Sequence, residues 1–509
     1  MKVKNIFVVI IVFFLFFPIA SFAVEKEELI KKIEDLNSEL EKLKKQVNEI
    51  ETKDASQEEK IKEVEKKADK ASDISRFTIY GDYRFRVDSV RAKFPAQHTY
   101  YYPAMGFGSD RSFTAENDSI MTHRFRLNIE APATENIGFV GRLAMYKVGG
   151  SQTSTSLSSG TDPMFGIFPQ NGMLFDGNTG HLATDNVLRV DRAYVNWMNI
   201  GGMPLAFSVG RRPSTGGAPT HLRQNVERDA PPLGLGIDYA FDGAVVGYFH
   251  NKPVNGNLKL CYGRGFESGF KGVATSKVDD VDFFGFNWEA QESSKNIFVI
   301  LQGFKAFDLT DMPEIEAFVN QPRFASTNVG DLYHLTGLVM HKIKNIDWFV
   351  SGGMSRTDPN DQSDAGFGSL LTDPGDSALD SKNGYAVYAG LRVPVTQLRS
   401  KFGLEYNYGS KNWVTLTPAS DDLISSKLAT RGSVYEAYWI WDIPDKPISR
   451  FAKTFIRIGY QYYDFDYSGS GLWLGEPKKV SEINTTDTKP LFPAAKSMQD
   501  IYASFDVYF

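Results

Sequence analysis

The stretch that decides the fold is IYASFDVYF, residues 501–509. One face of this stretch is entirely apolar, because Ile501, Ala503, Phe505, Val507 and Phe509 alternate with tyrosine, serine and aspartate. An alternation with a period of two predicts a β-strand that has one face against an apolar medium. A protein core or the lipid of a membrane can supply that medium, and the rest of the sequence distinguishes the two.

The first 23 residues have the pattern of a secretory signal peptide. Lysines at positions 2 and 4 precede the apolar run IFVVIIVFFLFF (6–17), and a small-residue cleavage pattern ends at Ala23. The apolar run is shorter than the roughly 20 residues that a spanning helix needs. We therefore expect cleavage after Ala23 and export of a mature chain that has no helical membrane span.

Charge and motifs exclude several classes of function. The formal net charge is −6, which gives no basis for a nucleic-acid partner. Cys261 is the single cysteine, so an intrachain disulfide framework is excluded. The sequence carries no phosphate-binding, zinc-protease or serine-hydrolase motif. We expect no enzymatic activity, no cofactor and no bound metal.

Residues 24–75 contain no glycine, proline or aromatic residue, and their apolar positions recur at spacings of four and three. This is the seam of a coiled coil, with a predicted core of Leu29, Ile33, Leu36, Leu40, Leu43, Val47, Ile50, Ile61 and Val64. In a parallel pairing the flanking charges are complementary, as in Glu39 with Lys44. A single solvated helix would expose the leucines, so we expect a parallel homo-oligomer, with a trimer favoured.

From Arg76 onward the period changes to two. We expect sixteen strands, at 77–88, 121–131, 137–148, 187–198, 204–211, 236–249, 257–264, 281–290, 297–307, 332–343, 346–355, 384–393, 401–408, 432–442, 452–464 and 500–509. Long and short connections alternate strictly between them, as in a transmembrane barrel with short turns at one end. The segment 236–249 is interpreted as one strand, because splitting it would break this alternation. The fold class predicted for residues 76–509 is an all-β, 16-stranded antiparallel transmembrane β-barrel, preceded by the α-helical coiled-coil stalk of residues 24–75.

These features together resemble a family of bacterial outer-membrane porins that carry a periplasmic coiled coil between signal and barrel. The likeness is strongest in GDYRFRVDS (81–89), LRVDRAYVNW (188–197) and GRRPSTGGAPTHLRQN (210–225). The final nine residues also resemble the carboxy-terminal signature of outer-membrane barrels. The resemblance implies an outer-membrane location, contact with membrane lipid, and passive diffusion of small hydrophilic solutes or ions.

A barrel of sixteen strands leaves an aqueous channel, and the charges that line it set its selectivity. The face opposite the apolar one predicts a lining of Arg84, Arg86, Arg124, Arg126, Arg142, Lys401, Glu405 and Arg457. Because arginine outnumbers the acidic residues in this predicted lining, we expect a weak anion preference, unless each arginine pairs with a neighbouring acid.

The sequence VGRR (209–212) resembles the strand end that precedes the constriction loop of general porins. If the segment 212–235 folds inward, the likeness implies a charged constriction built from Arg212, His221, Arg223, Glu227, Arg228 and Asp229.

Two other functions stay open. The barrel could anchor a tether whose stalk binds the cell wall or a periplasmic partner, or it could form a sleeve around a partner protein. A wide lumen without an inward loop would favour the sleeve.

Overall fold

The computed structural model describes residues 31, 34–35, 37–42, 77–100, 108–150, 181–183, 186–213, 215–252, 254–270, 278–311, 326–417, 421–424 and 426–509. The chain divides into two compact units, Met1–Ser75 and Arg76–Phe509. The described residues of the first unit are helical, and Leu40, the one described member of the predicted coiled-coil core, is exposed. The predicted signal peptide, the rest of that core and any pairing of helices lie outside the described residues.

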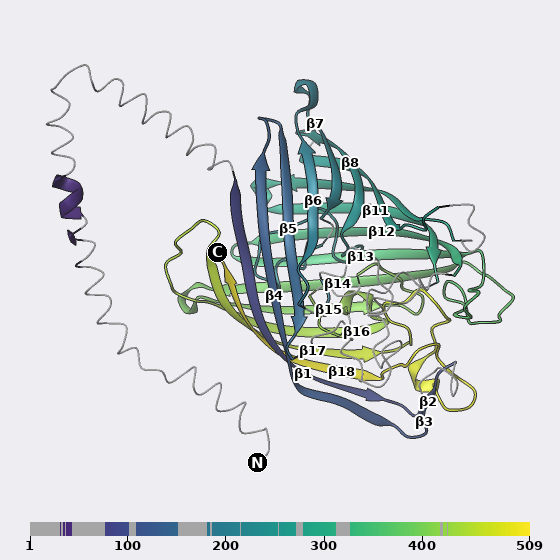
Figure 1. Ribbon diagram of the computed structural model, residues 1–509. Coiled ribbons are helices and arrows are strands. Elements are labelled where there is room, and N and C mark those ends of the chain that lie inside the picture. Colours follow the sequence, from purple (N-terminus) through teal and green to yellow (C-terminus); the bar gives the residue numbers. More distant parts are fainter. Residues whose placement is uncertain are drawn as a thin grey trace, which may run out of the picture. The chain divides into compact units, whose positions relative to one another are not determined.

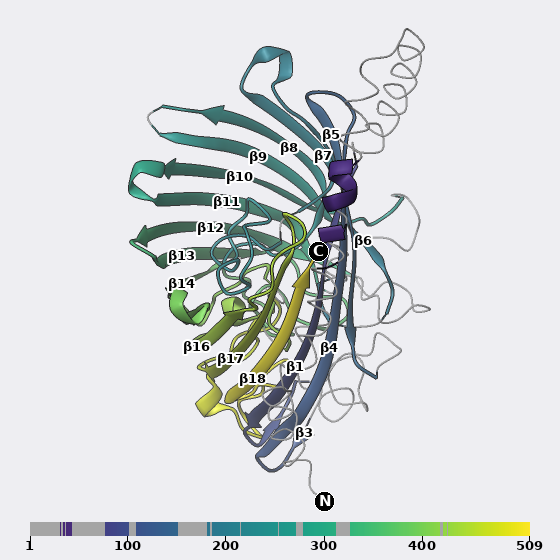
Figure 2. The same cartoon turned by 90° about the vertical axis from the view of Figure 1, so that its left-hand side faces the viewer.

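The second unit is a closed antiparallel barrel (Figures 1 and 2). Its sixteen strands in the described part of the chain are β1 (Thr78–Phe94), β4 (Phe113–Pro132), β5 (Ile137–Val148), β6 (Arg189–Trp197), β7 (Leu205–Arg212), β8 (Phe241–His250), β9 (Asn255–Phe266), β10 (Val281–Glu292), β11 (Ile297–Thr310), β12 (Asn328–Ile343), β13 (Ile346–Pro359), β14 (Lys382–Val395), β15 (Ser400–Gly409), β16 (Gly432–Asp442), β17 (Lys453–Phe465) and β18 (Ser497–Tyr508). Each strand pairs with its neighbours in sequence, and β18 closes the barrel against β1. The predicted strand number and barrel class are confirmed.

Smaller elements complete the described unit. The strands β2 (Gln97–His98) and β3 (Gly108–Ser109) form a separate two-stranded sheet. Five short 3-10 helices are η4 (Ile200–Gly202), η5 (Ser293–Lys295), η6 (Thr396–Leu398), η7 (Lys427–Ala429) and η8 (Val480–Glu482). Among the described residues, no helix is both long and apolar enough to cross a membrane.

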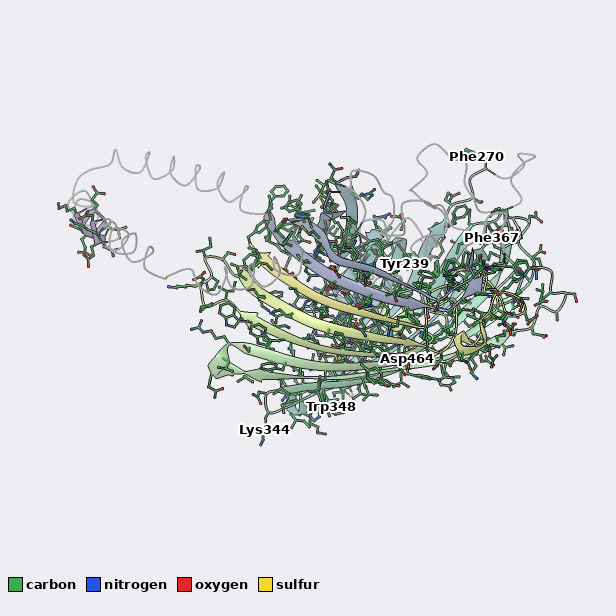
Figure 3. The ribbon with its side chains drawn as sticks, turned by 90° about the horizontal axis from the view of Figure 1, so that it is seen from below. Tyr239, Phe270, Lys344, Trp348, Phe367 and Asp464 are labelled. Carbon is green, nitrogen blue, oxygen red and sulfur yellow. The ribbon has the colours of Figure 1, made fainter. Side chains whose placement is uncertain are left out.

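The connections differ in length at the two ends of the barrel. At the short-turn end, Lys344 lies in the two-residue turn between β12 and β13, whereas Phe270 and Phe367 lie in long segments at the opposite, long-loop end (Figure 3). The long connections are 95–112, 149–188, 213–240, 267–280, 311–327, 360–381, 410–431 and 466–496. Long and short connections alternate around the whole barrel, as the sequence predicts.

The polarity of the barrel is the reverse of that of a globular protein. Large apolar side chains such as Ile79, Tyr385 and Leu404 are 55% to 62% exposed on the outer face. The interior faces of the same strands carry buried charges such as Arg84 and Glu405. Exposed apolar residues on every strand need an apolar solvent, and a lipid bilayer supplies one.

Two strand boundaries differ from the prediction for a physical reason. β1 continues past Ser89 to Phe94, and its inward side chains there, Val90, Ala92 and Phe94, are buried and apolar. The alternation therefore continues, but here the inward side chains are the apolar ones, because this part of β1 lines an apolar core beneath the loops. β8 begins only at Phe241, so the interpretation of 236–249 as one strand is wrong. Residues 236–240 belong instead to the preceding connection, where Ile237 forms an isolated bridge with Leu416.

The segment 213–240, called here the crossing loop, packs inside the barrel. Its apolar residues Ala218, Leu222, Leu233 and Leu235 form a core with the inner faces of β11 to β14 and with Trp413 and Leu428 of the connection 410–431. Close approach requires glycine at Gly217, where a Cβ atom would lie 1.7 Å from the carbonyl oxygen of Pro232. Part of the barrel interior is therefore filled by protein.

Inward-facing glycines elsewhere accept aromatic rings from the next strand. Gly403 pairs with Tyr438 and Gly459 pairs with Tyr502, and a Cβ atom on either glycine would lie within 2.3 Å of the ring. The Tyr502 hydroxyl donates to Glu436 Oε1 at 2.6 Å. Both pairs pack the interior wall, and the Tyr502 ring also brings its hydroxyl to the charged network of the lumen.

Replacing Gly459 with alanine should destabilise the barrel by about 1–3 kcal/mol, because the new methyl group displaces the Tyr502 ring. The matched control is Gly247→Ala in β8, where the nearest atoms to an added Cβ lie 3.8 Å away. The thermal transition of detergent-solubilised protein, followed by circular dichroism, measures both. Equal transition temperatures for the two variants would contradict this packing argument.

Candidate functional site: the arginine-lined lumen

Five inward-facing arginines line one side of the barrel. Arg84 and Arg86 lie on β1, Arg124 and Arg126 on β4, and Arg457 on β17, and we call them the arginine cluster. Strand pairing brings them together, because β4, β1, β18 and β17 are adjacent in the barrel. All five are largely or fully buried, so their mutual repulsion requires nearby carboxylates.

The barrel wall supplies part of that compensation. Asp82 lies between the two arginines of β4: Arg126 Nε donates to Oδ1 at 2.7 Å, and Arg124 Nη2 donates to Oδ2 at 3.1 Å. Arg84 Nε donates to Asp506 Oδ1 at 2.5 Å, across the β1–β18 pairing that closes the barrel. Side-chain charge thus reinforces the closure.

Arg86 is fully buried and contacts the wall on several sides. Its Nε donates to Asp88 Oδ1 at 2.7 Å and its Nη2 to Asp500 Oδ2 at 3.3 Å. The guanidinium lies 4.3 Å from the centre of the Tyr502 ring, a cation–π distance. Its Nη1 donates to the backbone oxygen of Asp421 at 3.0 Å, which brings a distant loop to the wall.

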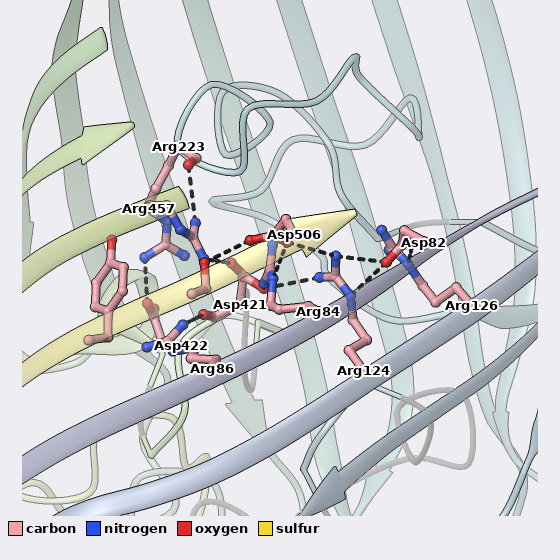
Figure 4. A network of polar contacts seen from close by, with 12 residues as sticks. Asp82, Arg84, Arg86, Arg124, Arg126, Arg223, Asp421, Asp422, Arg457 and Asp506 are labelled. Atoms are coloured by element: carbon pink, nitrogen blue, oxygen red, sulfur yellow. Dashed lines mark hydrogen bonds and ion pairs between the residues drawn. The ribbon is translucent and has the colours of Figure 1, made fainter. Parts of the chain in front are cut away.

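Asp421 is the central counter-charge of the arginine cluster (Figure 4). Its carboxylate accepts from Arg84 Nη1, from Arg124 Nη1 at 3.3 Å and from Arg457 Nη2 at 2.9 Å. Its φ of 71° is a left-handed conformation that aspartate tolerates better than most residues. Burial alone would raise the pKa of Asp421, but the surrounding guanidinium groups hold this pKa well below its ordinary value.

The crossing loop reaches the wall beside the arginine cluster through Arg223. This buried side chain donates from Nη1 to Asp422 Oδ1 at 2.5 Å and to Glu436 Oε2 at 3.1 Å. Lys427 Nζ donates to the same Glu436 oxygen at 2.5 Å and also pairs with Glu405. Two loops and two strands therefore share one buried charge network.

The turn of the crossing loop is fixed at Asn225. Lys401 Nζ donates to Asn225 Oδ1 at 2.9 Å, and Asn225 Nδ2 donates to Asp442 Oδ1 at 2.9 Å. Lys453 Nζ donates to the Asn225 backbone oxygen at 2.5 Å. Contacts to β15, β16 and β17 at one residue anchor this part of the loop.

The other residues of the predicted constriction are spread around the lumen. Arg228 Nη2 donates to Glu289 Oε2 on β10 at 2.8 Å. Glu227 lines the lumen cavity, whereas Arg212 ends β7 and its guanidinium lies 5.1 Å from the Tyr194 ring. His221 is largely buried, and burial lowers its pKa to about 3. The six residues therefore do not form a single ring of charge.

A second guanidinium site lies on β5 and β6. Arg142 and Arg192 are opposite each other in register, and a bulge at Asp191 turns two successive side chains of β6 inward. The crossing loop places Asp229 between them: Arg142 Nη1 donates to Oδ2 at 2.7 Å, and Arg192 donates to Oδ1 at 2.8 Å and to Oδ2 at 2.6 Å. Partial removal from water inside the barrel would raise the pKa of Asp229, but the adjacent guanidinium charges, first that of Arg192, keep this pKa below its ordinary value.

Between the crossing loop and the arginine cluster lies a cavity of about 620 Å³. Five cationic side chains line it, Arg124, Arg126, Arg142, Arg450 and Lys453. Five carboxylates also line it, Asp82, Glu227, Asp229, Asp238 and Asp421. At the short-turn end, Phe451 stacks on Tyr80 with ring centres 4.3 Å apart. The cavity is thus polar, closely balanced in charge and large enough for a small solute.

The sequence interpretation did not identify Asp421, Asp422 and Lys427, nor the pair Asp191 and Arg192. One signal was present for the loop residues: Leu423, Ile424 and Leu428 are apolar residues inside a long connection, and all three are buried. For β6 the bulge breaks the alternation, so side-chain direction could not be read from parity.

Comparison with known proteins gives a family. The family model described as "Protein of unknown function (DUF3373)" matches residues 114–509, and the chain belongs to this family. None of the curated proteins matches. Similar solved structures include OmpT of Vibrio cholerae, at 11% identity with 85% of this chain and 97% of that chain covered and a TM-score of 0.40. The DcaP channel of Acinetobacter baumannii is 11% identical, with 85% and 97% covered and a TM-score of 0.41. An anion-selective porin from Comamonas acidovorans is 11% identical, with 85% and 99% covered and a TM-score of 0.42.

Proposed function

We propose that this member of the DUF3373 family is an outer-membrane channel through which small hydrophilic solutes or ions diffuse passively. The observation that carries the proposal is the reversed polarity of the closed barrel, apolar outside and charged inside, around a polar cavity of about 620 Å³. Short turns then face the periplasm and long loops face the outside, as in bacterial barrels of this kind.

We infer a weak anion preference for this channel. Arginine stays charged throughout the accessible pH range, so the arginine cluster is a fixed positive charge in one wall, and two of its members, Arg124 and Arg126, line the cavity. The carboxylates around it nearly balance that charge, since five cations and five carboxylates line the cavity. Each arginine of the cluster is also ion-paired with a carboxylate, so the lining argues against strict selectivity and leaves at most a weak anion preference.

Of the two alternatives, the sleeve is the less favoured. A sleeve needs a wide lumen, whereas the crossing loop fills part of the described interior and is tied to it through Arg223 and Asn225. A tether remains compatible with a channel, because it depends on residues 24–75, and its partner would be the cell wall or another periplasmic component.

Liposome swelling tests the channel directly. Vesicles containing the folded full-length protein should swell in isotonic pentose solution and swell more slowly in trisaccharide solution, because the cavity restricts solute size. The heat-dependent shift in gel mobility verifies folding. Folded barrels that admit no pentose would contradict the diffusion function.

Deleting residues 24–75, with the signal segment retained, should convert a homo-oligomer to monomers. The reason is that the predicted heptad seam of this segment buries leucines only between chains. Light scattering coupled to size exclusion measures the mass of both proteins in the same detergent. An unchanged number of chains in the deletion variant would contradict assembly through the coiled coil.

A further inference from the structure

The pair of arginines on β5 and β6 has the geometry of a carboxylate receptor. Arg142 and Arg192 are neighbours across two strands, and their side chains are only 2% and 6% exposed. They hold both oxygens of Asp229 through three N–H donors, the planar, two-oxygen pairing by which guanidinium recognises carboxylate. The carboxylate that occupies this receptor, that of Asp229, belongs to the chain itself.

The two sides of this contact differ in how firmly they are held. Arg142 is anchored from behind, because its Nε donates to buried Asp191, which also pairs with His181. Asp229 faces the cavity, and its side chain is 39% exposed. A carboxylate arriving through the cavity would therefore meet one arginine that is held in place, Arg142, and an accessible competitor.

Exchange at this site needs only rotation of one side chain. The backbone N–H of Asp229 donates to the oxygen of Gly216 at 3.2 Å, and the preceding residue, Arg228, is paired with Glu289. These contacts hold the crossing loop independently of the Asp229 carboxylate. The site can open while the loop stays in place.

Two N–H donors of the arginine pair remain unsatisfied while Asp229 occupies it. Arg142 Nη2 and Arg192 Nε are buried and have no hydrogen-bond partner among the residues that the structure describes. Buried guanidinium N–H groups normally find acceptors, so the site has more donors than Asp229 satisfies. The guanidinium cluster around Asp421 is different, because that carboxylate is 6% exposed and shielded from exchange.

We propose that Arg142 and Arg192 form a binding site for solutes that carry a carboxylate, and that Asp229 occupies this site as an internal competitor until such a solute displaces it. The inference rests on the proposed channel function and names the class of solute that the channel retains along its path. The remainder of a bound solute would occupy the adjoining cavity, whose volume of about 620 Å³ suits a small organic acid.

Calorimetric titration of the detergent-solubilised full-length protein tests the site. Butyrate should bind, whereas butyramide, which has nearly the same shape without the charge, should not. In Asp229→Asn the internal competitor is lost, and butyrate affinity should rise about tenfold if the native carboxylate occupies the pair about 90% of the time. In Arg192→Gln butyrate binding should be lost.

The control is Asp282→Asn, which removes the same charge from an arginine–carboxylate contact outside the cavity, where Arg264 retains Asp280 and Glu267. Its butyrate affinity should equal that of the native protein. The inference is overturned if Asp229→Asn and Asp282→Asn bind butyrate equally, or if Arg192→Gln binds it normally. Inorganic phosphate binding more tightly than butyrate would overturn the assignment to carboxylates.

The same preparations separate this inference from the channel itself. Solute-driven swelling of vesicles without butyrate binding in calorimetry would reject the site and retain the channel. Butyrate binding by folded protein that admits no solute would reject the diffusion function and leave a binding site. Gel mobility shift confirms that each variant is folded before either result is interpreted.

Discussion

Replacing Asp421 with asparagine will shift the channel toward anions and raise its anion conductance. The substitution removes a charge that contacts Arg84, Arg124 and Arg457 together. Asparagine keeps the size of the side chain and tolerates the left-handed backbone at this position. After screening by salt, a charge at contact distance changes the relative energies of anion and cation by about 1 kcal/mol, or about fivefold in permeability ratio.

The reversal potential under a salt gradient measures this ratio in a planar bilayer. The control is Glu116→Gln, which removes a carboxylate that is exposed on the long-loop part of β4. That control should behave as the native channel does. An unchanged reversal potential in Asp421→Asn would show that the arginine cluster does not face the conducting path.

Replacing Arg223 with alanine will release the crossing loop. Arg223 is fully buried between Asp422 and Glu436, and its backbone oxygen accepts from Arg457 Nη1 at 3.1 Å. Removal of one member of a buried charge network leaves carboxylates without their partner, which typically costs about 3–5 kcal/mol. We expect a lower unfolding temperature and a larger, noisier single-channel current, because the loop no longer holds one position in the lumen.

The comparison for this variant is Arg91→Ala. Arg91 lies on the outer face of β1, 59% exposed and 3.7 Å from Glu116, and such surface pairs contribute about 0–1 kcal/mol. Thermal transitions and current amplitudes should therefore match the native protein. If Arg223→Ala gave the same steady current as Arg91→Ala, the crossing loop would not limit conduction.

Much of the barrel could be predicted from the sequence, because the bilayer imposes a simple rule on each strand. Side chains on one face meet lipid, so the alternation is visible even in short stretches such as 501–509. The rule applies only to the part of each strand whose outer face is apolar. Where β1 extends beyond Ser89 the inner residues become apolar and the outer ones charged, and the predicted strand ended too early.

The filled interior could have been suspected from one strand. Residues 297–301 of β11 are Ile, Phe, Val, Ile and Leu, with no polar residue facing the lumen. A strand that is apolar on both faces is covered on both faces. The inward-facing side chain of Ile300 packs against the crossing loop, in a core that also contains Leu338 and Phe349 of β12 and β13.

The charge network could not have been predicted in the same way. Arg84 and Asp421 are 337 residues apart, and no local pattern links a strand near the start of the barrel to a loop near its end. Lumen arginines could be assigned by parity, but their partners depend on which loops fold inward. At Asp191 a bulge interrupts the alternation, so even the inward direction of this side chain could not be assigned from the sequence. Contacts between distant segments follow from packing of the whole chain.

The most direct test of the central claim is single-channel recording of the folded, full-length protein in a planar bilayer under a salt gradient. The account predicts discrete current steps, with a reversal potential displaced slightly toward that of the anion. Discrete steps with cation selectivity would contradict the role of the arginine cluster. Complete absence of current from protein that shows the heat-dependent gel shift of a folded barrel would contradict the channel itself.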